Sequence, residues 1–289
     1  MKLAIFSHCT IDSIVLGSSS YEQTGGAACY GSITAKNLKF DVDVHTKFGN
    51  DFPKEFLSKN KVRFENAFSD KPTTRFKIII SGSDRTLCLL NQCESIEYSK
   101  TNADGVLISP VYHEIRNDIY KKITNDSSFV ILDPQGFLRR TDSEKNIILE
   151  KTDIDLSKIS AIKTSPDEIF CLTNDMGIGA MKNLQKRGVE HVMVTNKREI
   201  SMLVKDRIYS ITLPNLELFD TTGIGDIFCS TFCCTMLKEK DFFWALCFAG
   251  GSAQAAIETK EVGLEKIPAK GAIETNAAYF YNQVKFKQV

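Results

Sequence analysis

Residues 220–228 read Asp220-Thr221-Thr222-Gly223-Ile224-Gly225-Asp226-Ile227-Phe228 and lead directly into an apolar run with helical spacing that ends at Leu237. The two glycines let the backbone turn tightly and expose its N–H groups, which side chains would otherwise crowd. The first turn of the following helix adds N–H groups without helical acceptors and the positive end of the helix dipole. These groups predict a nest for an anion, most often a phosphate. An aspartate inside such a nest, Asp226, indicates a residue that handles a proton.

The same stretch has a plainer interpretation, in which Asp226 only caps the helix, as aspartate often does. As a whole, however, it resembles the D-T-x-G-A-G-D signature of the ribokinase family of carbohydrate kinases, with Ile224 in place of the usual alanine. The resemblance implies that Asp226 is the catalytic base. It also implies that the backbone of Gly223, Ile224 and Gly225 forms the anion hole.

The composition of the 289 residues narrows the functional class, because Lys plus Arg equals Asp plus Glu, 36 each. This balance gives no electrostatic case for binding nucleic acid or an anionic membrane. No secretory segment follows Met1 and no apolar run has spanning length, so we expect a cytoplasmic protein. The nine cysteines include no C-x-x-C pair and the four histidines are scattered, so neither predicts a zinc site or a disulfide framework.

Short apolar segments alternate with segments of helical spacing along the chain. The strand-like segments are 3–6, 42–46, 106–108, 129–132 and 191–194, and the helical ones are 27–38, 115–123, 178–186, 227–237 and 242–257. The alternation predicts an α/β fold with a doubly wound, mostly parallel sheet covered on both faces. No linker or repeat divides the sequence, so we predict one ribokinase-like domain over residues 1–289.

Two segments, 76–80 and 86–90, break this alternation and read as an antiparallel hairpin. Together with residues 13–17 they would form a small separate sheet. In the ribokinase family a β-lid in this part of the chain covers the sugar, and the resemblance therefore implies lid segments at about 13–22 and 70–99. A homodimer through this lid is a candidate assembly.

The residues expected on the acceptor side of the site begin with Asp12, which follows the first strand, where open α/β sheets bind ligands. A carboxylate there can accept hydrogen bonds from two neighbouring hydroxyls, and the family has a substrate-binding aspartate at this place; a surface loop is the alternative. Gly25 and Gly26 match the start of the family pattern G-G-x-x-x-N, with Tyr30 in place of the asparagine. Arg75 precedes the hairpin and is either a substrate contact or a solvated arginine.

The metal-binding expectations come from three places. Ser165-Pro166-Asp167-Glu168 has the form of a helix-capping box, and the family has N-x-x-E here, tied to magnesium. The resemblance implies that Glu168 assists Mg²⁺ through water, and a cap alone remains the alternative. Asp133, at the end of a strand, is similar in position to an aspartate of the family that assists the metal or substrate region. Asp220 and Thr222 are candidate ligands of a monovalent cation, K⁺.

The nucleotide-binding expectations rest on two further segments. Thr195 and Lys197 fall where the family has T-x-G-x-x-G, although both glycines are missing here. Gly250 and Ala253 lie in a late helix whose small residues make room for adenine in the family. A tight contact between helices is the alternative interpretation of these small residues.

The sequence thus predicts a kinase that uses ATP and Mg²⁺, with K⁺ as a candidate third cofactor, to phosphorylate a hydroxyl of a small polyol such as a sugar or cyclitol. Tyr30 and the stretches around Asp133 and Ser165 resemble an archaeal-type inositol and sugar kinase branch. A nucleoside kinase of the same fold is the first alternative, and a catalytically idle relative that senses a sugar or nucleotide is the second. A Rossmann dinucleotide protein is disfavoured, because no G-x-G-x-x-G follows a strand.

Overall fold

The computed structural model describes residues 1–81, 84–214 and 220–289. The strands of its largest sheet are β1 (Lys2–Phe6), β4 (Asp41–His45), β7 (Gly105–Ile108), β8 (Val130–Leu132), β11 (Ala161–Thr164), β12 (His191–Asn196), β13 (Glu199–Val204), β14 (Arg207–Thr212) and β15 (Lys285–Gln288). Their order is β15-β14-β13-β12-β11-β8-β7-β1-β4. From β12 to β4 neighbouring strands run parallel, and β13, β14 and β15 continue the sheet antiparallel.

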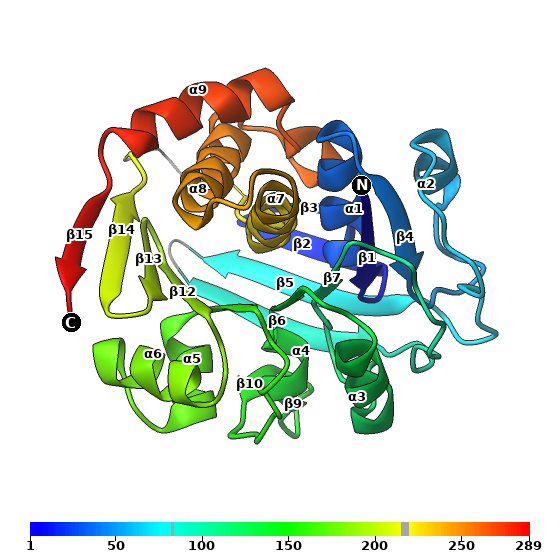
Figure 1. Cartoon of the computed structure of the whole chain (residues 1–289). Helices are drawn as coiled ribbons and strands as arrows, with labels where there is room; N and C mark the ends of the chain where they lie inside the picture. Colours follow the sequence, from blue (N-terminus) through cyan, green and yellow to red (C-terminus); the bar gives the residue numbers. More distant parts are fainter. Residues whose placement is uncertain (82–83, 215–219) are drawn as a thin grey trace.

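Helices cover both faces of this sheet (Figure 1). On one face lie α1 (Ala27–Asn37), α7 (Ile224–Glu239), α8 (Phe242–Glu258) and α9 (Lys270–Tyr281), and on the other α3 (Asn117–Asn125), α4 (Gln135–Leu138), α5 (Pro166–Thr173) and α6 (Gly177–Lys186). The short α2 (Glu55–Lys59) lies beyond β4, and the 3₁₀ helix η1 (Gly263–Lys266) precedes α9.

The core is divided by the sheet into two layers, as the pleat requires. In β1, Leu3 and Ile5 belong to one buried cluster, while Ala4 and Phe6 belong to the other. Because both faces of the central strands are covered, these strands are apolar without alternation. The predicted doubly wound α/β class, with a mostly parallel sheet, is confirmed.

A small second sheet is built from β2 (Thr10–Leu16), β3 (Ser19–Gly25), β5 (Thr74–Ser81) and β6 (Asp84–Asn91), in the order β3-β2-β5-β6. One face of it buries Ile14, Phe76 and Ile78 against Val111. The predicted hairpin is present as β5 and β6. Asp12, expected in a loop, lies instead within β2, because residues 10–16 pair with β3 on one side and β5 on the other. A further two-stranded sheet joins β9 (Arg139–Thr141) and β10 (Ile147–Leu149).

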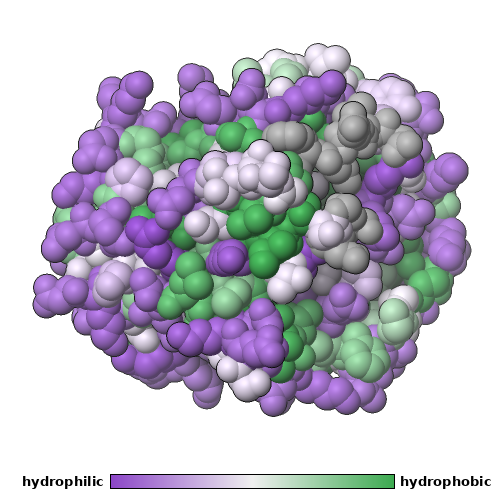
Figure 2. Space-filling view, turned by 180° about the vertical axis from the view of Figure 1, so that it is seen from behind, coloured by the Kyte–Doolittle hydropathy of each residue, from purple (hydrophilic) through white to green (hydrophobic). Residues whose placement is uncertain are grey.

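The outer surface is mixed in character. Hydrophilic side chains dominate the margins of the face in Figure 2, and hydrophobic ones gather near its centre. Among the described residues, no helix combines the length and the apolar character that crossing a membrane would require.

Candidate active site

The stretch predicted to form an anion nest lies where α7 begins. Gly223 is the residue before the helix, with φ 81°, a value that favours glycine. A Cβ at this position would also lie 2.5 Å from the ring of Tyr30, which packs beneath it. The N–H of Ile224 donates to the carbonyl of Thr221 at 3.3 Å. The next two N–H groups of the helix, at Gly225 and Asp226, have no helical acceptor four residues back and remain for an anion.

Asp226 stands in the first turn of α7 and is only 8% exposed. Its Oδ1 accepts a long hydrogen bond from the hydroxyl of Ser109 at 3.5 Å. The pKa of Asp226 is raised to about 7, first by burial and then by the neighbouring carboxylate of Asp133, while Lys163 and Arg139 oppose the shift. A carboxyl group with this pKa exchanges a proton near neutral pH, as a general base must.

Asp12 faces the same space from the small sheet and is 4% exposed. Gly25 of the neighbouring strand lies against its carboxylate, so closely that a Cβ there would collide with it. Burial raises the pKa of Asp12 to about 6. Among the described residues, Asp12 Oδ1, Thr10 Oγ1 and Thr222 Oγ1 are buried without a hydrogen-bond partner. Three orphaned oxygens around one space favour a polar ligand there, because buried polar groups are normally paired.

Three cationic side chains line the cleft: Arg85, from β6, and the pair Lys163 and Arg139. Lys163, from β11, places Nζ 3.0 Å from Asp133 Oδ2 and 3.3 Å from where a Cβ of Gly225 would be. Burial alone would lower the pKa of Lys163, but the carboxylate of Asp133 holds it above its usual value. Arg139 is fixed by donating to the Val111 carbonyl at 2.9 Å and to Gln135 Oε1 at 2.6 Å. Lys163 and Arg139 are therefore both held in place before any ligand arrives.

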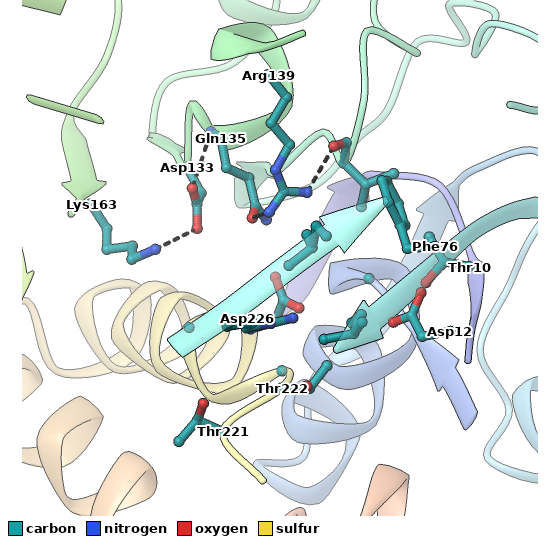
Figure 3. Close-up of a pocket in the computed structure, with 17 residues that line it drawn as sticks. Thr10, Asp12, Phe76, Asp133, Gln135, Arg139, Lys163, Thr221, Thr222 and Asp226 are labelled. Carbon is teal, nitrogen blue, oxygen red and sulfur yellow. Dashed lines mark hydrogen bonds and ion pairs between the residues drawn. The ribbon is translucent and has the colours of Figure 1, made fainter. Parts of the chain in front are cut away.

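These groups surround one cleft of about 180 Å³. It is lined by Thr10, Asp12, Gly26, Phe76, Ile78, Arg85, Leu87, Val111, Asp133, Gln135, Arg139, Lys163, Thr221, Thr222, Gly223, Gly225 and Asp226. In Figure 3, Asp226 lies between Asp133 and Thr222, and Asp12 lies across the cleft from Lys163. The small sheet thus contributes apolar side chains, the carboxylate of Asp12 and the cation Arg85, whereas the large sheet and α7 contribute Lys163, Asp133 and the N–H groups at the start of the helix.

Comparison with known proteins identifies the fold. The sequence matches no family model and no curated protein. The structure, however, is similar to the sulfate complex of a pyrophosphate-dependent kinase in the ribokinase family, with a TM-score of 0.81 and 19% identity over 94% of this chain and 99% of that one. It is also similar to Arabidopsis thaliana ribokinase complexed with ribose and ATP, with a TM-score of 0.75 and 16% identity over 95% of this chain and 98% of that one.

This chain has the ribokinase fold. The fold is shared by the nucleoside kinase of Methanocaldococcus jannaschii, which matches with a TM-score of 0.74 and 16% identity over 96% of this chain and 98% of that one. The fold implied by the sequence resemblance is confirmed, including the small separate sheet.

Within the ribokinase fold, the structure brings some of the expected acceptor-side residues to the cleft and places others behind it. Asp12 and Gly26 line the cleft. Gly25 supports Asp12 from behind, and Tyr30 is fully buried under Gly223. Arg75 turns to Asp51 and Glu22, with N–O distances of 3.0 Å to each.

The residues expected to bind the nucleotide lie outside the cleft lining. Thr195 is in β12, and Lys197 follows in the turn to β13 with φ 52°. Gly250 and Ala253 are buried in α8, and a Cβ at Gly250 would collide with Ile211 of β14. The space left by the absent side chain of Gly250 is therefore taken by Ile211 of the protein itself.

The expected metal ligands have protein partners. Glu168 Oε2 accepts from Ser165 N at 2.7 Å, while Ser165 Oγ accepts from Glu168 N at 3.2 Å, which completes the capping box. Asp220 and Thr222 bind the ammonium of Lys266. Burial would raise the pKa of Asp220, but Lys266 holds it below its usual value; burial also lowers the pKa of Lys266, against the effect of Asp220.

Sequence reasoning missed Lys163 and Thr10 as cleft residues and left Arg139 without a role. Lys163 carries a usable signal, because a lysine near the carboxyl end of a short buried strand in an α/β sheet lies where ligands bind. Arg139 could be found only from the fold, since its position depends on contacts with Val111 and Gln135.

Proposed function

We propose that this protein transfers a phosphoryl group to a hydroxyl of a small polyol, such as a sugar or cyclitol. The observation that carries the proposal is the position of Asp226, a buried carboxyl group in the first turn of α7 whose pKa is raised to about 7, beside N–H groups open to an anion. A base and an anion nest in one cleft are the two parts that phosphoryl transfer to an alcohol requires.

In this mechanism Asp226 accepts the proton of the acceptor hydroxyl as the hydroxyl oxygen bonds to the terminal phosphorus of the donor. The bond from that phosphorus to the bridging oxygen breaks, and the rest of the donor leaves with this oxygen. The N–H groups of Gly225 and Asp226 stabilise the charge on the transferring group. Lys163 and Arg139, both fixed by neighbouring side chains, attract the donor phosphates. The walls contributed by Phe76, Ile78 and Leu87 exclude water, which would otherwise compete as acceptor.

Mg²⁺ fits this site as an ion carried mainly by the donor. Among the described residues no group of three or more acidic, histidine or cysteine side chains could form a metal cage. Such a cage is not needed, because Mg²⁺ in kinases is held by phosphates, water and one or two carboxylates. Asp133, in the cleft, and Glu168, through water, are the carboxylates that would hold it. When bound, the ion would neutralise charge on the phosphates.

The acceptor would occupy the side of the cleft next to Asp12. Its carboxylate can accept hydrogen bonds from hydroxyls, and Thr10 Oγ1 beside it is free for another. A nucleoside, whose ribose offers the same hydroxyls, remains the alternative acceptor. An idle sensor would bind the polyol without turnover, but it would have no use for a carboxyl group with a pKa near neutral.

ATP is the donor that the sequence resemblance implies, and one observation favours inorganic pyrophosphate as a second candidate. The space that small residues of α8 would offer to adenine at Gly250 is filled by Ile211. Pyrophosphate has no adenine ring, so it needs only the anion nest and the cations Lys163 and Arg139 to bind. One protein of the same fold is described as a pyrophosphate-dependent kinase.

The test is a panel of polyols and nucleosides incubated with Mg²⁺ and either ATP or pyrophosphate, with the phosphorylated product followed by ³¹P NMR. We expect one acceptor class and one donor to give product that requires the enzyme. The Asp226→Asn variant serves as the matched control, because it retains the cleft and lacks the base. Binding of a polyol without product from any pair would favour the sensor instead.

A further inference from the structure

The ammonium of Lys266 lies directly behind the anion nest. Lys266 ends η1 and is 0% exposed. Its Nζ donates to the carbonyl of Asp220 at 2.9 Å, to Asp220 Oδ2 at 2.6 Å and to the carbonyl of Thr222 at 3.0 Å. Three N–H groups of one ammonium thus meet three oxygens, an arrangement that satisfies a buried lysine completely.

The acceptors of this ammonium belong to the backbone that shapes the nest. Thr222 is the residue before Gly223, where the chain turns into α7. The other oxygen of Asp220, Oδ1, accepts from Thr222 N at 2.9 Å. Lys266 and Asp220 together therefore fix both the carbonyl and the N–H of Thr222, and with them the direction in which the Gly225 and Asp226 N–H groups point.

Asp220 and Thr222 are also the residues expected from the sequence as candidate ligands of K⁺. A K⁺ ion bound by the Asp220 carboxylate and the carbonyls of Asp220 and Thr222 would need oxygens that Lys266 already holds, and it would lie beside a second positive charge in a buried site. The residues present therefore do not fit a monovalent cation in addition to Lys266.

We infer that the Lys266 ammonium takes the place of a bound monovalent cation and holds the anion nest in shape, so that the protein works without K⁺. Lys266 is a positioning residue, since it acts through the Asp220–Thr222 backbone. The kinetic part of this inference rests on the proposed function, whereas the cation-binding part does not.

The first experiment compares thermal unfolding in potassium, methylammonium and tetramethylammonium chloride at equal ionic strength. We expect the wild-type melting temperature to be the same in all three. Lys266→Ala should melt about 5 °C or more lower, because it leaves the Asp220 carboxylate buried and unpaired. K⁺ and methylammonium, which fit the vacated space, should restore part of this loss, and tetramethylammonium should not.

Two further variants control for packing and for the loss of a lysine. Lys266→Met keeps most of the side-chain volume without the charge, so it should be destabilised and should not respond to any of the cations. Lys47→Ala truncates another buried lysine, outside the cleft lining, and should show no cation response. Selective stabilisation of the wild type by K⁺ would overturn the inference, even if Lys266→Ala does not fold. An Lys266→Ala protein that ignores every cation would also overturn it.

The second experiment measures turnover in the same three salts. The wild-type kcat should be independent of the cation, and the kcat of Lys266→Ala should fall at least about tenfold and recover with K⁺ or methylammonium. A merely structural lysine would lower the melting temperature without cation-dependent recovery of kcat. If the wild type turns over no acceptor at all, the proposed function fails, and the unfolding data still decide whether Lys266 replaces a cation.

Discussion

Asp226 owes its chemical character to three features of its surroundings: deep burial, a second carboxylate at Asp133 and the fixed cations Lys163 and Arg139. Burial and Asp133 favour the protonated form, whereas the cations favour the charged form. The balance leaves a carboxyl group that can take up a proton near neutral pH. Capping alone would instead favour an ionised aspartate with hydrogen bonds to N–H groups, which would lower its pKa.

Asp226→Asn tests the role of this residue as base. We expect kcat to fall by a factor of at least about 10², the scale of a positioned general base, with the KM values for donor and acceptor changed little. Steady-state kinetics on the wild type and the variant check this. Near-normal turnover in Asp226→Asn would remove the residue from the chemistry.

The raised pKa of Asp226 also predicts how stability depends on pH. Between pH 3.8 and about 7 the folded protein keeps a proton on Asp226 that the unfolded chain has lost, so this residue makes the folded state less stable as pH rises. Asn carries no such charge. The free energy of unfolding of Asp226→Asn, relative to the wild type, should therefore increase by about 2–3 kcal/mol from pH 5 to pH 8.

Denaturant unfolding of both proteins at the two pH values measures this difference. Asp12, whose pKa is raised to about 6, titrates in both proteins, and its carboxylate is one of the groups that raise the pKa of Asp226. A difference that stays constant with pH would mean that the Asp226 carboxyl group is ionised in the folded protein at pH 5.

At the scale of single elements, Glu168 at the start of α5 has two candidate roles, capping the helix and assisting Mg²⁺, and substitutions there can distinguish them. Ser165 and Glu168 form a reciprocal capping box, so removing either partner should affect the helix. Ser165→Ala should lower the free energy of unfolding by about 1 kcal/mol and leave the Mg²⁺ dependence of the rate unchanged. Glu168→Gln keeps an acceptor for the Ser165 N–H, but it removes the negative charge.

If Glu168 assists Mg²⁺ through water, Glu168→Gln should raise the Mg²⁺ concentration needed for half-maximal rate, with a smaller loss of stability than Ser165→Ala. Titrations of rate against Mg²⁺, together with unfolding curves for both variants, compare the two effects. Equal Mg²⁺ dependence in the wild type and both variants would leave Glu168 with its capping role only.

Helices and strands with a clear pattern of apolar residues could be predicted from the sequence. Strands that form only because another strand pairs with them could not. Five strands of the large sheet and three helices are apolar runs of the right length, and each lies within a few residues of its predicted range: β1, β4, β7, β8, β12, α1, α7 and α8. The central strand β11 is only four residues long and was not predicted. In contrast, β3 is polar along most of its length and becomes a strand only because β2 pairs with it. The strand β15 is exposed throughout and depends in the same way on β14.

In the candidate site, too, the local features could be predicted from the sequence and the long-range contacts could not. The nest of residues 223–226 is local, and glycine, aspartate and a helix start reveal it in one stretch of sequence. The contacts of Lys163 with Asp133 and of Lys266 with Asp220 join residues 30 and 46 positions apart. Such pairs follow from the order of strands in the sheet and from where α7 begins and η1 ends, which no local pattern encodes.

At the scale of the whole molecule, the cleft is formed by two sheets with different contributions. The small sheet supplies Asp12, Thr10, Arg85 and most of the apolar side chains, whereas the large sheet and α7 supply Lys163 and the nest. This division predicts that the acceptor and the donor are bound by different parts of the fold. We propose that the small sheet acts as a lid over the acceptor, and that a change in it should affect the acceptor alone.

Asp12→Asn tests this division of the cleft while preserving the volume of the side chain. A buried carboxylate that pairs with hydroxyls gives strong discrimination, because an acceptor lacking one of them leaves it unsatisfied. We expect kcat/KM for the acceptor to fall by about 10² and the preference for it over its deoxy analogue to shrink, with the donor KM unchanged within about twofold.

The control is Glu22→Gln, on the neighbouring strand β3, where the side chain is 61% exposed and pairs with Arg75 outside the cleft lining. It should leave both KM values unaltered, since an exposed ion pair contributes little. A rise in the donor KM of Asp12→Asn with an unchanged acceptor KM would mean that the donor and acceptor sides of the cleft are the reverse of those proposed here.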